Sequence, residues 1–290
     1  MSLPVAGTAQ ADEAVGTGGL TVTDHSAAAP AMRVMDPVTG AVSGVLAEGV
    51  DGVLSTKTGQ VAYIRYRDEC VQETEGCVRI PDLVTAAVDG TNQRVLVESV
   101  QDEGGDYYIG RPDWSPNGKR VLYDTPRGLE WIGADGSGSE ILASGRAGTF
   151  SPDGSSIAFM ATTQYESWDG WEYSQDVHVM DLATRQVRPL TRQQHATEAP
   201  DWSPDGQRIV YVAEYGVRVV EVATGTVTEI PTPGLSNFRT PVFSPDGSAI
   251  AFHALDDSTG TGAVYVVDAD GANLHVLTDR AVTLTDWISK

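Results

Sequence analysis

The sequence predicts an all-β protein, a six-bladed β-propeller made of four-stranded antiparallel blades. Two interleaved repeats indicate this fold. A phrase of Trp or Phe followed by Ser-Pro-Asp/Asn-Gly occurs four times, and a short apolar run follows each copy. Hairpin turns that contain Asp, Gly or both occur between these copies and beyond them. Short strands and Gly-rich turns that recur about every 40 residues are typical of propeller blades.

The first repeat has a physical explanation. Proline presets φ for a tight turn, Asp or Asn bonds to its own backbone, and glycine adopts the conformation that a side chain would forbid. We expect the preceding aromatic residue to fill the gap between neighbouring blades, and the following apolar run to form a strand that is buried on both faces. The four copies are Asp113–Gly118, Thr149–Gly154, Asp201–Gly206 and Val242–Gly247.

The second repeat sets the number of blades. Each turn joins two short β-rich runs and has the composition of a hairpin. Six such turns predict six blades. They lie in Met35–Val42, Val88–Asn92, Gly133–Ser137, Met180–Arg185, Glu221–Gly225 and Val267–Ala272.

The two ends of the chain share the remaining blade. Gly52–Tyr63 is a degenerate fifth copy of the first repeat, and Leu284–Lys290 reproduces only its start. Leu20–Thr23 and Met32–Met35 have the pattern of the strands that should follow. We therefore predict that a C-terminal strand pairs with N-terminal strands and closes the ring without an exposed edge.

Residues 19–290 are expected to form this single propeller, and residues 1–18 to be a disordered leader remnant or added segment. The first residues are rich in Ala, Gly and Thr, and Ala9-Gln-Ala11 is similar to a secretory cleavage site. No apolar run is long enough to span a membrane.

The Ser-Pro-Asp-Gly blades resemble those of the TolB-type six-bladed propeller over residues 19–290. The resemblance implies the fold more than a function, since that superfamily includes periplasmic interaction proteins, propeller domains of serine peptidases and some sugar-acid lyases. A Gly-x-Ser-x-Gly nucleophile elbow is absent from the sequence.

The net charge is −21. It argues against nucleic acid or an anionic membrane as a partner, because no basic face exists to neutralise phosphate. A cationic partner fits better, and a purely solubilising role for the acidic surface is the alternative. We expect a monomer.

Cys70 and Cys77 are the two cysteines, and they lie in a polar insertion. So close a pair can form a disulfide that closes the loop, which implies an oxidising compartment. A metal site and free thiols are the alternatives. With the cleavage-like site and the resemblance, the pair predicts an extracytoplasmic protein: secreted, periplasmic or tethered as a lipoprotein.

Long insertions should all lie on one face of the propeller, and the opposite face, with its short turns, should be flat. The insertion 162–176 combines aromatic residues with carboxylates, as in protein interfaces and carbohydrate-binding rims. The alternative is that its tryptophans fold down onto the blade as a satellite core. The candidate residues of this face are Tyr165, Trp168, Trp171 and Tyr173.

Residues just before each inner strand should surround the mouth of the central channel, where they could receive an anionic or polar group. They form no recognisable catalytic set, and we predict neither a metal nor a cofactor. Asp113, Asp201 and Asp286 should bond backbone amides, with a cation-binding ring as the less favoured alternative. The mouth candidates are Tyr107, Tyr108, Arg146, His195, Arg239 and Arg280.

Two functions are consistent with these patterns. The first is a non-enzymatic binding or scaffold propeller that engages a protein or glycan through the long-loop face or the channel. The second is an enzyme with its site in the funnel, a lyase or hydrolase acting on a sugar acid or a similar polar substrate through His195 with Arg146 or Arg239.

Overall fold

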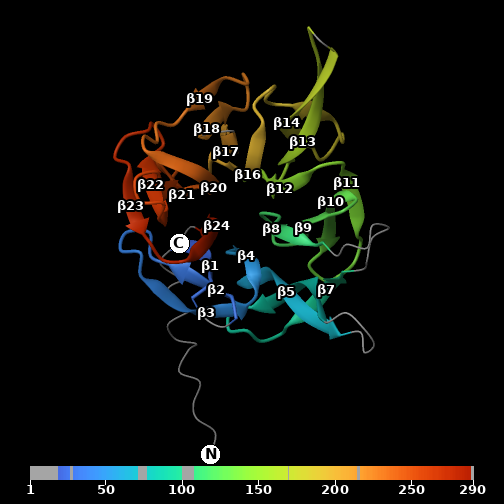
Figure 1. Ribbon diagram of the computed structural model, residues 1–290. Helices are drawn as coiled ribbons and strands as arrows, with labels where there is room; N and C mark the ends of the chain where they lie inside the picture. The colour runs from blue at the N-terminus through green and yellow to red at the C-terminus, as the bar shows by residue number, and fades with distance from the viewer. Residues whose placement is uncertain are drawn as a thin grey trace, which may run out of the picture.

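The computed structural model describes residues 19–26, 29–70, 77–99, 108–168, 170–213 and 216–288, without the side chains of 69, 70, 77, 78 and 167. These residues form strands and turns only. The strands make six antiparallel sheets of four, arranged in a ring around a centre (Figure 1). The predicted six-bladed propeller is confirmed.

Blade 1 contains both ends of the described chain, and the other blades follow in sequence order. Blade 1 consists of β24 (Val282–Ile288), β1 (Gly19–Asp24), β2 (Ala31–Met35) and β3 (Val42–Glu48). Blade 2 consists of β4 (Val50–Ser55), β5 (Gln60–Cys70), β6 (Cys77–Ala87) and β7 (Arg94–Glu98). Blade 3 consists of β8 (Gly110–Trp114), β9 (Arg120–Thr125), β10 (Gly128–Gly133) and β11 (Glu140–Ala143).

The second half of the ring repeats the same order from the centre outwards (Figure 1). Blade 4 consists of β12 (Arg146–Phe150), β13 (Ser156–Ser167), β14 (Gly170–Asp181) and β15 (Val187–Pro189). Blade 5 consists of β16 (Ala196–Trp202), β17 (Arg208–Ala213), β18 (Gly216–Glu221) and β19 (Val227–Glu229). Blade 6 consists of β20 (Leu235–Phe243), β21 (Ala249–Asp256), β22 (Gly262–Asp268) and β23 (His275–Thr278).

The ring closes as the sequence predicts. β24 is the inner strand of blade 1 and pairs antiparallel with β1, so that Leu20 lies opposite Trp287. The Thr285 hydroxyl donates a hydrogen bond to the Thr21 carbonyl oxygen at 3.1 Å. Beyond the strands, the His25 amide donates to the Ala281 carbonyl oxygen. Because β24 and β1 pair with each other, neither terminal strand leaves an unpaired edge where the ring closes.

The repeated turn is closed by its serine. In blade 4 the Ser151 hydroxyl donates to Asp153 at 2.7 Å and accepts the Ser156 amide at 2.9 Å. Gly154 has a φ of +70°, which favours glycine. The same serine and aspartate contacts recur in blades 5 and 6. A local sequence thus determines the same turn in successive blades.

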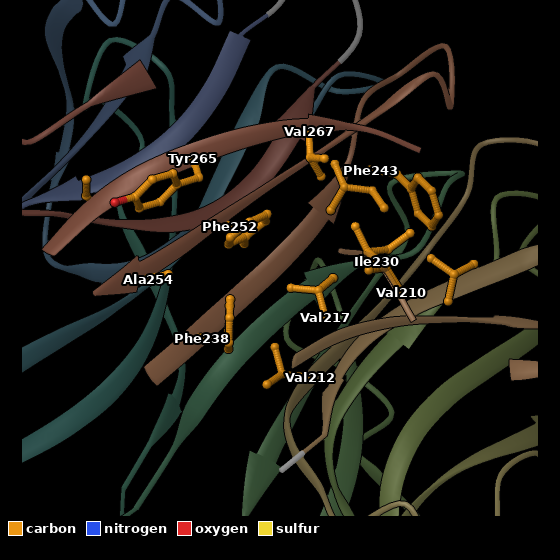
Figure 2. Close-up of a cluster of buried hydrophobic side chains, with 13 residues drawn as sticks. Val210, Val212, Val217, Ile230, Phe238, Phe243, Phe252, Ala254, Tyr265 and Val267 are labelled. Carbon is orange, nitrogen blue, oxygen red and sulfur yellow. The ribbon is translucent and has the colours of Figure 1, made fainter. Parts of the chain in front are cut away.

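The core lies between adjacent blades. The motif aromatics Phe150 and Trp202 are buried there, as predicted. Figure 2 shows the junction of blades 5 and 6, where Phe238 and Tyr265 lie on either side of Phe252 with ring centroids 5.8 and 6.0 Å from it. Such interlocked side chains hold neighbouring blades together through apolar contact.

Replacing Phe252 by Ala is expected to lower the free energy of unfolding by about 3–5 kcal/mol. The Phe252 side chain is fully buried, and its loss would leave a cavity between two blades. Equilibrium denaturation in urea measures this change. The exposed Val187→Ala is a matched control, and similar losses for both variants would contradict the packing argument.

Candidate functional site

A cavity of about 240 Å³ lies at the centre of the ring, and the inner strands of all six blades line it. Its polar lining combines carboxylates, guanidinium groups and hydroxyls. We call it the channel cavity. The charged residues in its lining are Asp51, Arg111, Asp113, Glu198, Asp201, Arg239 and Asp286.

A bulge in each inner strand shapes this cavity. Five of these strands shift register two or three residues before the motif aromatic or its equivalent, and β24 shifts against β1 near Thr285. Bulges bend a strand and redirect its side chains. Asp51, Arg111, Ala147 and Thr240 have φ between +44° and +55° at these positions, a conformation that side chains adopt at a cost of about 1–3 kcal/mol.

The sequence contains a signal for these bulges. Two residues before the motif aromatic stands a proline or glycine: Gly52, Pro112, Gly148, Pro200 and Pro241. Proline suits a bulge because it has no amide hydrogen to leave unpaired, and glycine permits the close bend. This pattern could have identified Arg111 and Glu198 as channel residues.

Three aspartates occupy equivalent positions on alternate blades. Asp286, Asp113 and Asp201 belong to blades 1, 3 and 5, whereas blades 2, 4 and 6 have Val or Thr at that position. Asp113 accepts a hydrogen bond from the Phe150 amide of the next blade at 2.7 Å. Asp201 accepts one from the Phe243 amide at 2.7 Å. Asp286 accepts the amide of its neighbour Trp287 at 2.6 Å. The predicted bonding of backbone amides is therefore confirmed for all three, and the bonds of Asp113 and Asp201 connect each blade to the next.

The channel walls enclose these carboxyl groups, and this burial raises their pKa values. The pKa of Asp113 rises to about 7 and that of Asp286 to about 6. The pKa of Asp201 is well above its usual value because of burial and of repulsion from Asp286. Among the described residues, no three His, Cys, Asp or Glu side chains converge as ligands of a metal ion. Repulsion from Asp286 also contributes to the raised pKa values of Asp113 and Asp201, so the three carboxyl groups influence one another across the channel.

Charged groups from several blades meet at one side of the mouth. The Arg111 guanidinium contacts the Glu198 carboxylate at 3.3 Å and thereby joins blades 3 and 5 across blade 4. The half-exposed Tyr108 lies in the field of Asp124, Arg111 and Arg146, and burial is the main cause of its raised pKa. Two of the predicted mouth residues, Tyr108 and Arg146, therefore lie near Arg111, which was not among the predicted residues.

Of the other described mouth candidates, Arg239 lines the channel cavity, whereas His195 and Arg280 do not. Arg239 lines the channel cavity and pairs with His253 across β20 and β21. His195 is exposed, with its amide donating to the Ser174 hydroxyl at 3.2 Å, and it is not part of the cavity lining. Arg280 is exposed and lies near Asp24, which pairs with Arg33 at 3.0 Å. Tyr107 lies outside the described residues.

The predicted long-loop residues lie on a hairpin that projects beyond the ring (Figure 1). Strands β13 and β14 pair continuously as far as Ser167 and Gly170. Trp168, Trp171 and Tyr173 are 95%, 64% and 63% exposed, so they do not form a satellite core. The Tyr165 hydroxyl donates to Glu172 across the two strands at 2.8 Å. The hairpin presents aromatic surface to the solvent.

The expectation of a flat opposite face is wrong between blades 4 and 5. A groove of about 690 Å³ lies there, lined by the repeated turns around Pro152 and Pro204 and by β15. Three aspartates line it, Asp153, Asp181 and Asp205, and each bonds within its own turn. The groove forms between two blades, so the length of each single turn does not reveal it.

The cysteine pair is only partly described. Cys70 and Cys77 are cross-strand partners at the ends of β5 and β6. Their side chains lie outside the described part, and the disulfide stays a prediction. Nowhere in the described residues is there a helix long and apolar enough to cross a bilayer.

Comparison with known proteins agrees with the geometry. The family model for the TolB beta propeller domain matches residues 48–282 of this chain. The Tol-Pal system protein TolB of Francisella tularensis subsp. mediasiatica is 24% identical over 258 residues, covering 67% of this chain and 55% of that protein. A probable dipeptidyl-peptidase 5 of Arthroderma benhamiae is 30% identical over 147 residues, 49% of this chain and 17% of the peptidase.

Among solved structures, TolB from Acinetobacter baumannii has a TM-score of 0.68 and 17% identity, and the match covers 93% of this chain and 66% of that one. This likeness shows the shared fold. The chain spans about half, or less, of the length of the curated relatives named above. Since the matched propeller model extends over most of the blades, the chain belongs to the TolB beta propeller domain family.

Proposed function

We propose that this protein is a non-enzymatic, extracytoplasmic binding scaffold that engages a protein or glycan partner through the β13–β14 hairpin and the channel mouth. The observation that supports it most is the exposure of Trp168, Trp171 and Tyr173 on a projecting ribbon. Clustered aromatic surface in water is costly for a soluble protein and marks interaction sites. TolB-like propellers support a binding or scaffold role, and the partner is part of the proposal.

The alternative is an enzyme acting through His195 with Arg146 or Arg239. Its support is the similarity of part of the chain to a dipeptidyl-peptidase. Against it stands the position of His195, which does not line the cavity to which Arg239 contributes. Metal analysis of the purified protein and a panel of sugar-acid and peptide substrates, with His195→Ala as the control, test this alternative. Turnover that is lost in His195→Ala would favour the enzyme.

Shortening the hairpin tests the binding role. Asp176 must stay, because it accepts hydrogen bonds from Thr191 and from the amides of Gln193 and Gln194. We therefore replace residues 164–173 by Asn-Gly, which joins the cross-strand pair Thr163 and Ser174 through a two-residue turn. Capture of envelope proteins and glycans on the immobilised protein should fall at least tenfold, with an unchanged thermal transition.

The matched control is Tyr66→Ser, which removes an exposed aromatic from the other long hairpin. It should retain capture. If the shortened protein still captures the same partners as the full chain, the proposed site is wrong.

A further inference from the structure

Among the described strands, two hairpins extend beyond their blades. The β12–β13 pairing ends at Arg146 and Met160, and the β14–β15 pairing ends at His178 and Pro189. Beyond these points β13 and β14 pair only with each other among the described strands. An unpaired edge presents a row of backbone donors and acceptors to which another strand can bond.

The edge of the β5–β6 hairpin carries side chains that protect it from pairing with another strand. Its projecting part, Arg65–Cys70 and Cys77–Pro81, contains charges of both signs and a proline. Arg67 pairs with Asp82 at 3.1 Å. The Arg79 guanidinium lies 4.6 Å from the Tyr66 ring centroid. Charged side chains and proline at an edge hinder strand addition.

The β13–β14 hairpin has neither the proline nor the basic side chains that protect the other edge, and its charged groups are all carboxylates. Residues 162–176 contain neither proline nor Lys, Arg or His. The cross-strand pairs Gln164–Tyr173 and Glu166–Trp171 place both aromatics on one face of the ribbon, where they are exposed. Threonine, tyrosine and tryptophan also favour strands. The edge of the β5–β6 hairpin is therefore protected by proline and basic side chains, whereas the edge of the β13–β14 hairpin is not.

Of the two open edges, β13 is the more accessible. The link to blade 5 runs beside the base of β14, where the Ser174 hydroxyl accepts the His195 amide and Asp176 accepts the Gln194 amide. No such described contact covers β13 from Thr163 to Glu166. An incoming strand would thus lie along β13.

The negative charge of the hairpin favours an incoming strand that carries positive charge. Residues 162–176 include four carboxylates, Glu166, Asp169, Glu172 and Asp176. A second copy of this chain would bring the same negative charge and a net charge of −21. Opposite charges on neighbouring strands stabilise a sheet, and like charges oppose it.

We propose that the β13 edge of this hairpin binds an extended segment of a partner protein by strand addition, and that this segment alternates Lys or Arg with β-branched residues. The inference rests on the proposed function and specifies its partner. Backbone hydrogen bonds provide the affinity, and contacts with Glu166, Trp171 and Tyr173 provide the selectivity.

The test uses an acetylated and amidated octapeptide that alternates Lys or Arg with Val or Thr. Hydrogen exchange of the full chain should slow at residues 162–166 when this peptide binds. N-methylation of alternate peptide amides removes edge hydrogen bonds and should weaken binding at least tenfold. Glu166→Lys should weaken binding of the basic peptide and strengthen binding of a peptide in which Glu replaces Lys or Arg. Tyr66→Ser should change the binding of neither peptide.

Equal binding of the N-methylated peptide, protection elsewhere, or no binding of the basic octapeptide would overturn strand addition. The proposed function would still hold after such results if the protein with the shortened hairpin no longer captures the envelope partner. Conversely, an envelope partner that remains bound to the shortened protein would remove the proposed function whatever the octapeptide does.

Discussion

Ending the chain before Val282 is expected to prevent formation of a stable monomeric propeller. The truncation removes β24, the inner strand of blade 1. Val282, Leu284 and Ile288 are buried, and each contributes about 1.5–3 kcal/mol through burial. Because a typical domain is stable by only about 5–15 kcal/mol, this loss and the newly exposed β1 edge should suffice for unfolding or association.

Circular dichroism and size-exclusion chromatography measure this outcome. A synthetic peptide of residues 281–290, added in trans, should restore a cooperative thermal transition by pairing again with β1. A truncated protein that melts cooperatively at the same temperature as the full chain would show that ring closure contributes little to stability.

The free energy of unfolding is expected to fall as the pH rises from about 4 to about 7. Asp113 and Asp286 have folded-state pKa values of about 7 and 6, above the ordinary value of 3.8. Asp124 is likewise raised to about 6, mainly by burial. In this range the folded state therefore holds protons that the unfolded chain releases, and each such proton changes the stability by about 1.4 kcal/mol per pH unit.

The repeated turns have the opposite effect at lower pH. Hydrogen bonds from serines lower the pKa values of Asp153, Asp205 and Asp246, the last to about 2. Their contribution is present above pH 4 and is lost as the pH falls toward 2. Stability should therefore be greatest near pH 4 to 5.

The triple variant Asp113→Asn, Asp201→Asn and Asp286→Asn separates these effects. Asparagine keeps an oxygen that can accept the Phe150 and Phe243 amides but removes the charge. Urea denaturation at each half pH unit should give a shallower slope between pH 4 and 7 and a more stable protein at pH 8. Parallel pH profiles for the variant and the original chain would refute a role for the channel carboxylates.

The candidate site was predictable only in part. The repeat indicated which segments approach the channel, and Arg239 of one such segment lines the cavity. Alignment on the motif aromatic treats every inner strand as straight. The bulges shift the side chains, so that Arg111 and Glu198 meet in the channel, whereas His195 remains exposed outside the cavity lining.

The sequence by itself determined the turns, the number of blades and the ring closure, because these depend on local conformational preference and on strand patterns that recur along the chain. Only the tertiary structure decided that Asp113, Asp201 and Asp286 influence one another across one channel, and that Trp168 and Trp171 stay in water. Both outcomes depend on which surfaces lie opposite a side chain once the blades are in the ring, and segments far apart in the sequence supply those surfaces.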